Sequence, residues 1–410
     1  MGQLIAARAF AGIGGGGMNT VTSILFSDIV PLRERGTWQG YINIFYAFGA
    51  ASGAPLGGIL ADSIGWRWAF LGQAPLCLAS FLAVLFALHL PKKDNSDWKK
   101  KLRRIDFLGA FFLVSAVFAL LLGLDRGSNA GWKAPIAWVS LLASFPLVLV
   151  FFYIETKVAQ APVAPYHIIL NPNLLALYLC NFFSFGGWLA AIFYIPLYWQ
   201  AVDDISATGA GVRMIPSIIF GTIGSLFAGF YMKRTGKYYW LTVLAYTGLV
   251  FGMIVITLCS GIVTDNNALI ITGMCLNAFS NGIGVTSTLI GLIANASRED
   301  QAIATACSYL FRSLGSVFGV SLSATVANQA LRKNLADELP KLGLPGKEAV
   351  EIADRVRQSL AYLKTLAPEV RAIVAECYAR STSAAFMLQI GLVAGAAVSA
   401  WFIREKALSK

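Results

Sequence analysis

Two arginines lie inside long apolar stretches of the sequence, where a charged side chain needs an explanation. Arg8 is near the start of its stretch, and Arg312 is near the middle of another. A charge in the hydrocarbon of a membrane costs about 3 kcal/mol or more unless it meets water or a partner, so such residues mark functional sites by default. Arg8 can reach the interface through its long side chain. For Arg312 we favour a cavity or an internal hydrogen-bond network.

The acidic residues are distributed differently, because all of them fall in connections or at the ends of apolar stretches. Proton transfer through a membrane generally needs a titratable group within it. Asp28 ends the first stretch, close to Arg33 and Arg35. These three side chains form either a charge cluster that holds one conformation or an ordinary solvated surface pair. Arg8, Asp28 and Arg312 are therefore the charged residues singled out as candidates for a coupling role.

No arrangement for catalysis or metal binding is evident. The six cysteines occur singly, the two histidines are isolated, and no nucleophile, base and orienting group come together. Gly12-x-Gly14-x-x-Gly17 has the letters of a dinucleotide-binding loop, but no strand precedes it, and close packing of helices explains the glycines better. The sequence therefore predicts neither an enzyme nor a cofactor or metal site.

The composition indicates which elements position these residues. Of the 410 residues, 57% are hydrophobic and 13% are charged, whereas soluble proteins have about 25% charged residues. A helix needs about 20 apolar residues to cross a bilayer, and roughly eleven blocks of this kind occur. They lie near residues 4–30, 39–61, 67–90, 105–124, 134–155, 172–201, 211–232, 238–262, 267–296, 302–327 and 384–404. We therefore predict an all-α integral membrane protein.

The placement of charge sets the expected orientation. The net charge of +11 is spread between apolar blocks and not gathered on one face, so a nucleic-acid partner is excluded. Lysine and arginine concentrate in one alternate set of short connections, which includes the segment 91–104 and the segment 233–237. Because basic loops stay in the cytosol, we expect a cytosolic C-terminus and place residue 1 on the other side, outside or in a lumen.

Two polar segments divide the chain into three parts. We expect residues 1–90 to hold three spans, residues 91–171 a basic cytosolic loop with two spans, and residues 172–410 a bundle of six. Bundles of six helices commonly pair about a central site, so the first part is an incomplete partner of the third. A long non-cytosolic loop is expected at 328–383. In it a surface helix that covers the bundle is predicted from the helical spacing of Ile352, Val356, Leu360 and Leu363.

Several motifs occur in the order of a known family. They are Leu4-x-x-x-Arg8-x-x-x-Gly12-Ile13-Gly14, Gly49-x-x-x-Gly53-Ala54-Pro55-x-Gly57-Gly58, the segment 58–70, Gly229-x-x-x-Lys233-Arg234-x-Gly236-Lys237 and the segment 312–320. The second has its proline one position late, and the fourth has lysine where aspartate is usual. Together they resemble the fourteen-helix drug:proton antiporter branch of the major facilitator superfamily. The run 16–36 resembles fungal members, including vacuolar basic amino acid transporters.

The resemblance implies a major-facilitator fold in which the first three of fourteen helices are missing, and it links Arg8 to proton transfer. It associates conformational change with Gly49, Gly53, Pro55, Gly57, Gly58, Arg234 and Gly236, although on spacing alone the glycines indicate tight helix contact. It places on cavity-lining helices Asn19, Asn181, Phe185, Trp188, Asn277 and Asn281. Each of these amides is equally well explained as an interhelical hydrogen bond.

The expected function is secondary active transport of small molecules, with protons as the coupling ion, by rocking of two bundles around a midplane site. The resemblance implies either export of drugs across the plasma membrane or import of basic amino acids into a vacuole. The lack of acids in the cavity favours export. The rival hypothesis is a truncated, transport-incompetent membrane protein or an assembly partner. Membrane lipid and a small-molecule substrate are the expected partners, and no cofactor is expected.

Overall fold

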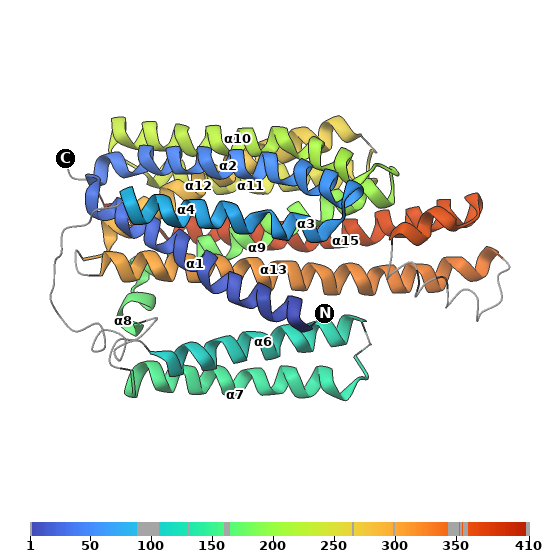
Figure 1. Ribbon diagram of the computed structural model, residues 1–410, viewed down its shortest axis with the longest axis horizontal. Coiled ribbons are helices and arrows are strands. Elements are labelled where there is room, and N and C mark those ends of the chain that lie inside the picture. The colour runs from blue at the N-terminus through green and yellow to red at the C-terminus, as the bar shows by residue number, and fades with distance from the viewer. Residues whose placement is uncertain are drawn as a thin grey trace.

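In the computed structural model the chain folds into a bundle of long helices that run side by side (Figure 1). The structure describes residues 2–87, 106–129, 132–159, 165–264, 266–297, 300–342 and 360–406, together with Ile352 and Arg355. These residues contain no strand, so the predicted all-α class is confirmed.

The described helices follow the predicted apolar blocks. In chain order they are α1 (Gly2–Ile29), α2 (Leu32–Ser63), α3 (Trp66–Leu71), α4 (Gln73–Ala87), α6 (Phe107–Asn129), α7 (Pro135–Lys157), α8 (Tyr166–Ile169), α9 (Pro172–Ala201), α10 (Ala207–Thr235), α11 (Tyr239–Cys259), α12 (Asn267–Asn295), α13 (Gln301–Glu338) and α15 (Pro368–Trp401), with 3₁₀ turns η1 (Leu339–Leu342) and η2 (Leu360–Thr365). Nine segments in the described part are long and apolar enough to cross a membrane. The remaining two predicted blocks correspond to α1 and α2, which have 28 and 32 residues.

Several helix ends are fixed by local chemistry. The Asn171 side chain accepts a hydrogen bond from the Asn173 N–H over 3.0 Å, and the Ser206 hydroxyl accepts one from the Gly209 N–H over 3.1 Å. Such caps satisfy backbone donors that have no partner in the first turn of a helix. α10 ends at Gly236, whose φ of 69° lies in the left-handed region that glycine adopts without a steric cost.

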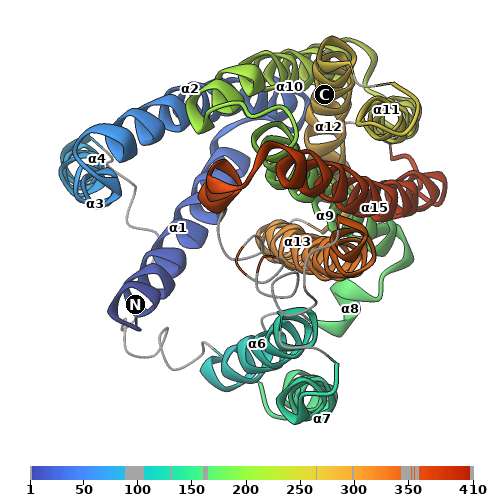
Figure 2. The same cartoon turned by 90° about the vertical axis from the view of Figure 1, so that its right-hand side faces the viewer.

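The second half of the chain forms the most densely packed region. α9 packs against α13 and α15, and α12 packs against α10 and α11 (Figure 2). The main hydrophobic core comes largely from these helices and includes Tyr178, Trp199, Leu249 and Phe386. α2 runs along α10, α6 and α7 form a pair beside α13, and α3 and α4 lie at the outer edge of the bundle. The residues of functional interest are therefore held mainly by the second half.

Glycines bring α9 and α13 into close contact. A methyl group on Gly315 would meet the carbonyl of Phe182, and one on Gly319 would meet the carbonyl of Gly186. Small residues spaced four apart allow helices to approach in this way. A second set of glycines has open space instead, since nothing described lies within 4 Å of a methyl group built on Gly12, Gly14, Gly17, Gly49, Gly53 or Gly57. The tight helix contact expected at these positions is not found in the described structure.

α13 and α15 extend beyond a single membrane span. At 1.5 Å per residue the 38 residues of α13 measure about 57 Å, whereas the hydrocarbon layer is about 30 Å thick. The range 328–383 is therefore not one loop, because helix continues to Glu338 and resumes at Pro368. Hydropathy misses these turns because they carry charged residues. We call residues 331–342 and 360–380 the overhang.

The overhang has an apolar core of its own. It contains Leu331, Leu335 and Leu339 from α13 and η1, packed against Val374, Cys377 and Tyr378 from α15. Ile352 and Leu363, which belong to the predicted surface helix, are buried in this cluster. Residues 360–365 form the 3₁₀ turn η2. Val356 and the basic segment 91–104 lie outside the described residues. The division into 1–90, 91–171 and 172–410 stays a prediction.

Candidate functional site

Arg312 is buried among three helices of the second half, with 5% of its surface exposed. From α13 its Nε donates a hydrogen bond to Asn181 Oδ1 on α9 over 3.1 Å, and its Nη2 donates to the carbonyl of Val285 on α12 over 3.2 Å. The guanidinium also lies 5.3 Å from the ring centre of Phe185 and 5.2 Å from that of Tyr309. Arg312 therefore lies in an internal hydrogen-bond network, which is one of the two alternatives expected for it.

Asn181 is the centre of this network and has no exposed surface. Its Nδ2 donates to Ser308 Oγ over 3.2 Å and to the Leu177 carbonyl over 3.1 Å. Its Oδ1 accepts from Thr288 Oγ1 over 3.2 Å, in addition to the bond from Arg312. Because donors and acceptors surround it on both sides, the amide is held in one orientation. We call Asn181, Thr288, Ser308 and Arg312 the buried arginine cluster.

Helical periodicity explains how the sequence places these groups. Ser308 and Arg312 are four residues apart on α13, and Asn181 and Phe185 are four apart on α9, so each pair lies on one helix face. The glycine contacts of Gly315 and Gly319 bring the two faces together. In the described part of the chain no carboxylate lies within ion-pair distance of Arg312. Among the described groups, the positive charge is therefore balanced only by dipoles and aromatic rings.

The other predicted cavity residues take separate places. Trp188 lies edge-on to Phe185, with ring centres 5.7 Å apart. Asn277 is buried on α12 and donates to the Leu249 carbonyl over 3.1 Å, which is the interhelical bond named as its alternative role. Asn281 is buried one turn later, and its Oδ1 has no hydrogen-bond partner among the described atoms. Among the predicted residues whose side chains the structure describes, only Asn181 and Phe185 contact Arg312.

The two other coupling candidates are not joined to Arg312 by a described contact. Arg8 is exposed on α1, 5.5 Å from the ring centre of Phe70. Asp28 and Asn19 both belong to α1, but their side chains are not among those that the structure describes. The same holds for the side chain of Pro55 and for the surroundings of Gly58, both on α2. Arg35 donates to the Val30 carbonyl over 2.8 Å and to Gln301 Oε1 over 3.3 Å.

In the loop motif, the described contact with α2 is made by a neighbour of the predicted residue. Arg234 is exposed at the end of α10, whereas Lys233 Nζ lies 2.8 Å from Glu34 Oε1 on α2. Deeper in the same interface Asn43 Nδ2 donates to Ser225 Oγ over 2.6 Å, and Ser225 shares a 2.7 Å hydrogen bond with Thr286. The motif located this contact along the chain, but a spacing pattern does not say which of two adjacent basic side chains faces the partner helix.

Metal binding has no support in the described residues, where no three His, Cys, Asp or Glu side chains lie close enough to hold an ion. The groups gathered around Arg312 are the Asn181 amide, the Thr288 and Ser308 hydroxyls and the aromatic rings of Phe185 and Tyr309. Such a set can bind and orient a polar small molecule in an apolar setting.

Comparison with known proteins identifies the family. The model of the Major Facilitator Superfamily matches residues 1–320. The chain is 36% identical to the Schizosaccharomyces pombe multidrug resistance protein fnx1, over 94% of this chain and 72% of that protein. It is 37% identical to the vacuolar membrane amino acid uptake transporter fnx2 of the same yeast, over 99% and 69%. It is 32% identical to vacuolar basic amino acid transporter 2 of Saccharomyces cerevisiae, over 93% and 82%. The chain therefore belongs to the major facilitator superfamily and is a multi-pass secondary transporter of small molecules, not an enzyme.

Proposed function

We propose that this protein carries amino acids across a vacuolar-type membrane, driven by a proton gradient, and that Arg312 receives the substrate carboxylate. The observation that carries the proposal is the buried guanidinium of Arg312, which has no carboxylate partner in the described structure. Arginine has five N–H donors, and carboxylates are its preferred two-point partner. A substrate carboxylate would supply the missing negative charge.

The aromatic side chains beside Arg312 suit the rest of such a substrate. Phe185 and Trp188 on α9 form an edge-to-face pair next to the guanidinium. A cationic side chain that lies over the face of an aromatic ring is stabilised by about 0.5–2 kcal/mol, and this needs no acidic residue in the site. The lack of cavity acids, which favours export of drugs when the sequence is considered alone, is thus compatible with a basic amino acid. The names of fnx2 and of vacuolar basic amino acid transporter 2 support the same substrate class.

The conformational cycle is proposed to break contacts between α2 and the second half. Glu34 pairs with Lys233 on α10, and Arg35 bonds Gln301 at the start of α13, so both contacts lie at the end of the bundle that holds the C-terminus (Figure 1). With the C-terminus in the cytosol, as the basic loops favour, these contacts close the cytosolic side. Breaking them would open that side by a rigid-body movement. Arg8 and Asp28 remain proposed sites of proton coupling.

Export of drug-like compounds is the second candidate function. It is supported by the name of fnx1 and by the aromatic and amide side chains around Phe185, which would bind uncharged molecules as well. The two functions differ at Arg312, since an uncharged drug has no carboxylate that could pair with the buried guanidinium.

Uptake into proteoliposomes decides between the two functions. The purified full chain is reconstituted, an acidic interior is imposed, and accumulation of radiolabelled arginine is compared with that of agmatine, which is arginine without its carboxylate. We expect arginine to accumulate until a protonophore collapses the gradient, and agmatine to remain outside. Gradient-driven movement of drugs without arginine uptake would establish the second candidate. Arginine uptake that a protonophore leaves unchanged would contradict proton coupling.

A further inference from the structure

A pocket lies at the end of the bundle opposite the C-terminus, where α9 ends and α15 begins (Figure 1). Its volume is about 290 Å³, and its walls come from the last turn of α9, the turn that follows it, η2 and the first turns of α15. This is close to the lower limit of about 300 Å³ for small-molecule sites. The pocket is separate from the buried arginine cluster, because none of that cluster's four residues lines it.

The pocket has one acid and one base on facing walls. Asp204, in the turn after α9, and Arg371, in the first turn of α15, form an ion pair with 2.6 Å between Oδ2 and Nη2. Their side chains are 52% and 35% exposed, so a ligand can reach both. The remaining walls are mostly small or apolar side chains, such as Ala372, Ala375 and Leu363. The two charged groups thus cancel in a site whose other lining side chains are apolar apart from Gln200.

The backbone at Asp204 gives a second indication that this turn is specialised. Its φ of 56° is in the left-handed region, and it is the one residue other than glycine with a positive φ in the described structure. Aspartate adopts this conformation more readily than most residues other than glycine. In this turn it directs its carboxylate at Arg371.

Resting on the proposed amino acid transport, we propose that this pocket is a second, distal binding site for zwitterionic amino acids. The ligand carboxylate pairs with Arg371 and the ligand ammonium pairs with Asp204, replacing the bond that the two side chains make with each other. Each protein charge then keeps a charged partner after the pair has opened. An amine without a carboxylate would pair with Asp204 but leave Arg371 unpaired.

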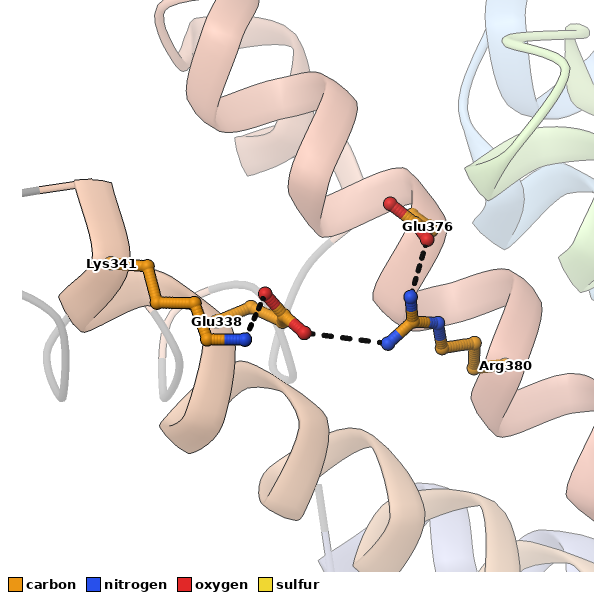
Figure 3. Close-up of polar contacts among 4 residues, drawn as sticks. All are labelled: Glu338, Lys341, Glu376 and Arg380. Carbon is orange, nitrogen blue, oxygen red and sulfur yellow. Dashed lines mark hydrogen bonds and ion pairs between the residues drawn. The ribbon is translucent and has the colours of Figure 1, made fainter.

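A neighbouring charge cluster provides a matched control. In the same overhang Glu338 accepts from Lys341 over 2.9 Å and from Arg380 over 3.4 Å, and Arg380 also donates to Glu376 over 2.6 Å (Figure 3). Arg380 and Glu376 belong to α15, like Arg371, and none of the four side chains lines the pocket. Neutralising Arg380 and Glu376 together thus removes one ion pair from the overhang, leaves its net charge unchanged and leaves the proposed site intact.

Thiol labelling tests the proposal on the whole protein without relying on transport. A cysteine replaces Ala372, which lines the pocket and is exposed, and Cys77, an exposed native cysteine, is replaced by serine. The labelling rate with a charged methanethiosulfonate reagent is measured with arginine or agmatine present. At an arginine concentration about ten times its Kd the rate should fall about tenfold, because only empty sites react. Agmatine should have no effect.

The control variants make the result specific. Lys341→Cys, in the overhang but outside the pocket, should label at the same rate with and without arginine. Protection of the Ala372→Cys protein should be lost with Asp204→Asn or Arg371→Gln and kept with Glu376→Gln plus Arg380→Gln. Equal protection by agmatine, or none by arginine at concentrations that saturate uptake, would overturn the proposal. Protection by arginine in a protein that transports no amino acid would instead overturn the proposed function and leave the site standing.

Discussion

Arg312 Nε donates a hydrogen bond to Asn181 Oδ1 over 3.1 Å, and both side chains are buried where α9, α12 and α13 meet. The hydrogen bonds that Asn181 Nδ2 donates to Ser308 and Leu177 fix the orientation of the amide. Its Oδ1 therefore stays directed at Arg312 and Thr288. Asn181 is therefore a positioning residue for the guanidinium, which also lies 5.3 Å from the ring centre of Phe185 and 5.2 Å from that of Tyr309.

Replacing Asn181 with aspartate should block the site while preserving the fold. The new carboxylate would lie at hydrogen-bond distance from Arg312 and would supply the partner that we assign to the substrate. A charged hydrogen bond contributes about 1.5–3 kcal/mol, so the Kd for arginine should rise about tenfold to a hundredfold. Equilibrium binding to the purified protein measures this. Asn277→Ala, which removes only the bond to Leu249, should leave the Kd unchanged; an unaltered Kd in Asn181→Asp would argue against a carboxylate site.

Two glycine substitutions should differ in their effect on stability. A methyl group at Gly319 meets the backbone of Gly186, so Gly319→Ala should lower the free energy of unfolding by about 1–3 kcal/mol. Gly53 has nothing described within 4 Å, so Gly53→Ala should change it by no more than about 0.5 kcal/mol. Thermal unfolding in detergent compares the two. If Gly53→Ala lowered the stability as much as Gly319→Ala, a helix that packs against Gly53 would have to exist beyond the described contacts.

The ion pair between Glu34 and Lys233 should influence conformation more than stability. Its side chains are 44% and 48% exposed, and pairs of this kind contribute about 0–1 kcal/mol. Glu34→Lys should therefore raise the fraction of molecules open on that side by no more than about fivefold. Exchanging the charges, with Glu34→Lys and Lys233→Glu together, should restore the original rate of labelling of a cysteine placed between the helices. If the exchange does not restore the labelling rate, the ion pair has no role in the conformational cycle.

The segment after α15 should stabilise the start of α11. Glu405 Oε1 accepts from the backbone N–H of Tyr238 over 2.9 Å and of Tyr239 over 3.3 Å. The buried Tyr238 hydroxyl in turn accepts from Asn295 Nδ2 over 2.8 Å. Removing a capping side chain costs about 0.5–2 kcal/mol, so Glu405→Ala should lower thermal stability by that amount. Arg404→Ala, whose described contact uses only its backbone carbonyl, is the control and should have little effect.

Much of the fold could be predicted from hydropathy. A membrane span must form its backbone hydrogen bonds within its own helix and therefore needs a continuous apolar run. The block 172–201 coincides with α9 for this reason. The ends of α13 and α15 could not be predicted in this way. Arg332, Lys333 and Asp337 interrupt the apolar run, although the helix continues through them on the support of Leu331 and Leu335 in the overhang core.

The candidate site could be predicted only in part. The cost of an intramembrane charge indicated Arg312, and an amide on α9 was expected at Asn181. Thr288 and Ser308 could not be found, since hydroxyls are common in such helices and only the packing of α12 and α13 shows which of them meet an amide. Lys233 was missed beside Arg234, because rotation about the helix axis, and not spacing within a motif, decides which one faces α2.

Arginine transport by an Arg312 variant tests the central claim most directly. Arg312→Gln keeps a donor for Asn181 but removes the charge together with the Nη2 donor to the Val285 carbonyl. Thermal unfolding and cysteine labelling outside the site establish that the variant is folded. Losing one partner of a buried charge pair costs about 2–5 kcal/mol, so proton-driven arginine uptake should fall at least about thirtyfold, through a higher KM. An Arg380→Gln protein, changed at an exposed arginine of the overhang, should retain uptake. Arginine uptake by folded Arg312→Gln with the KM of the unaltered protein would contradict the account.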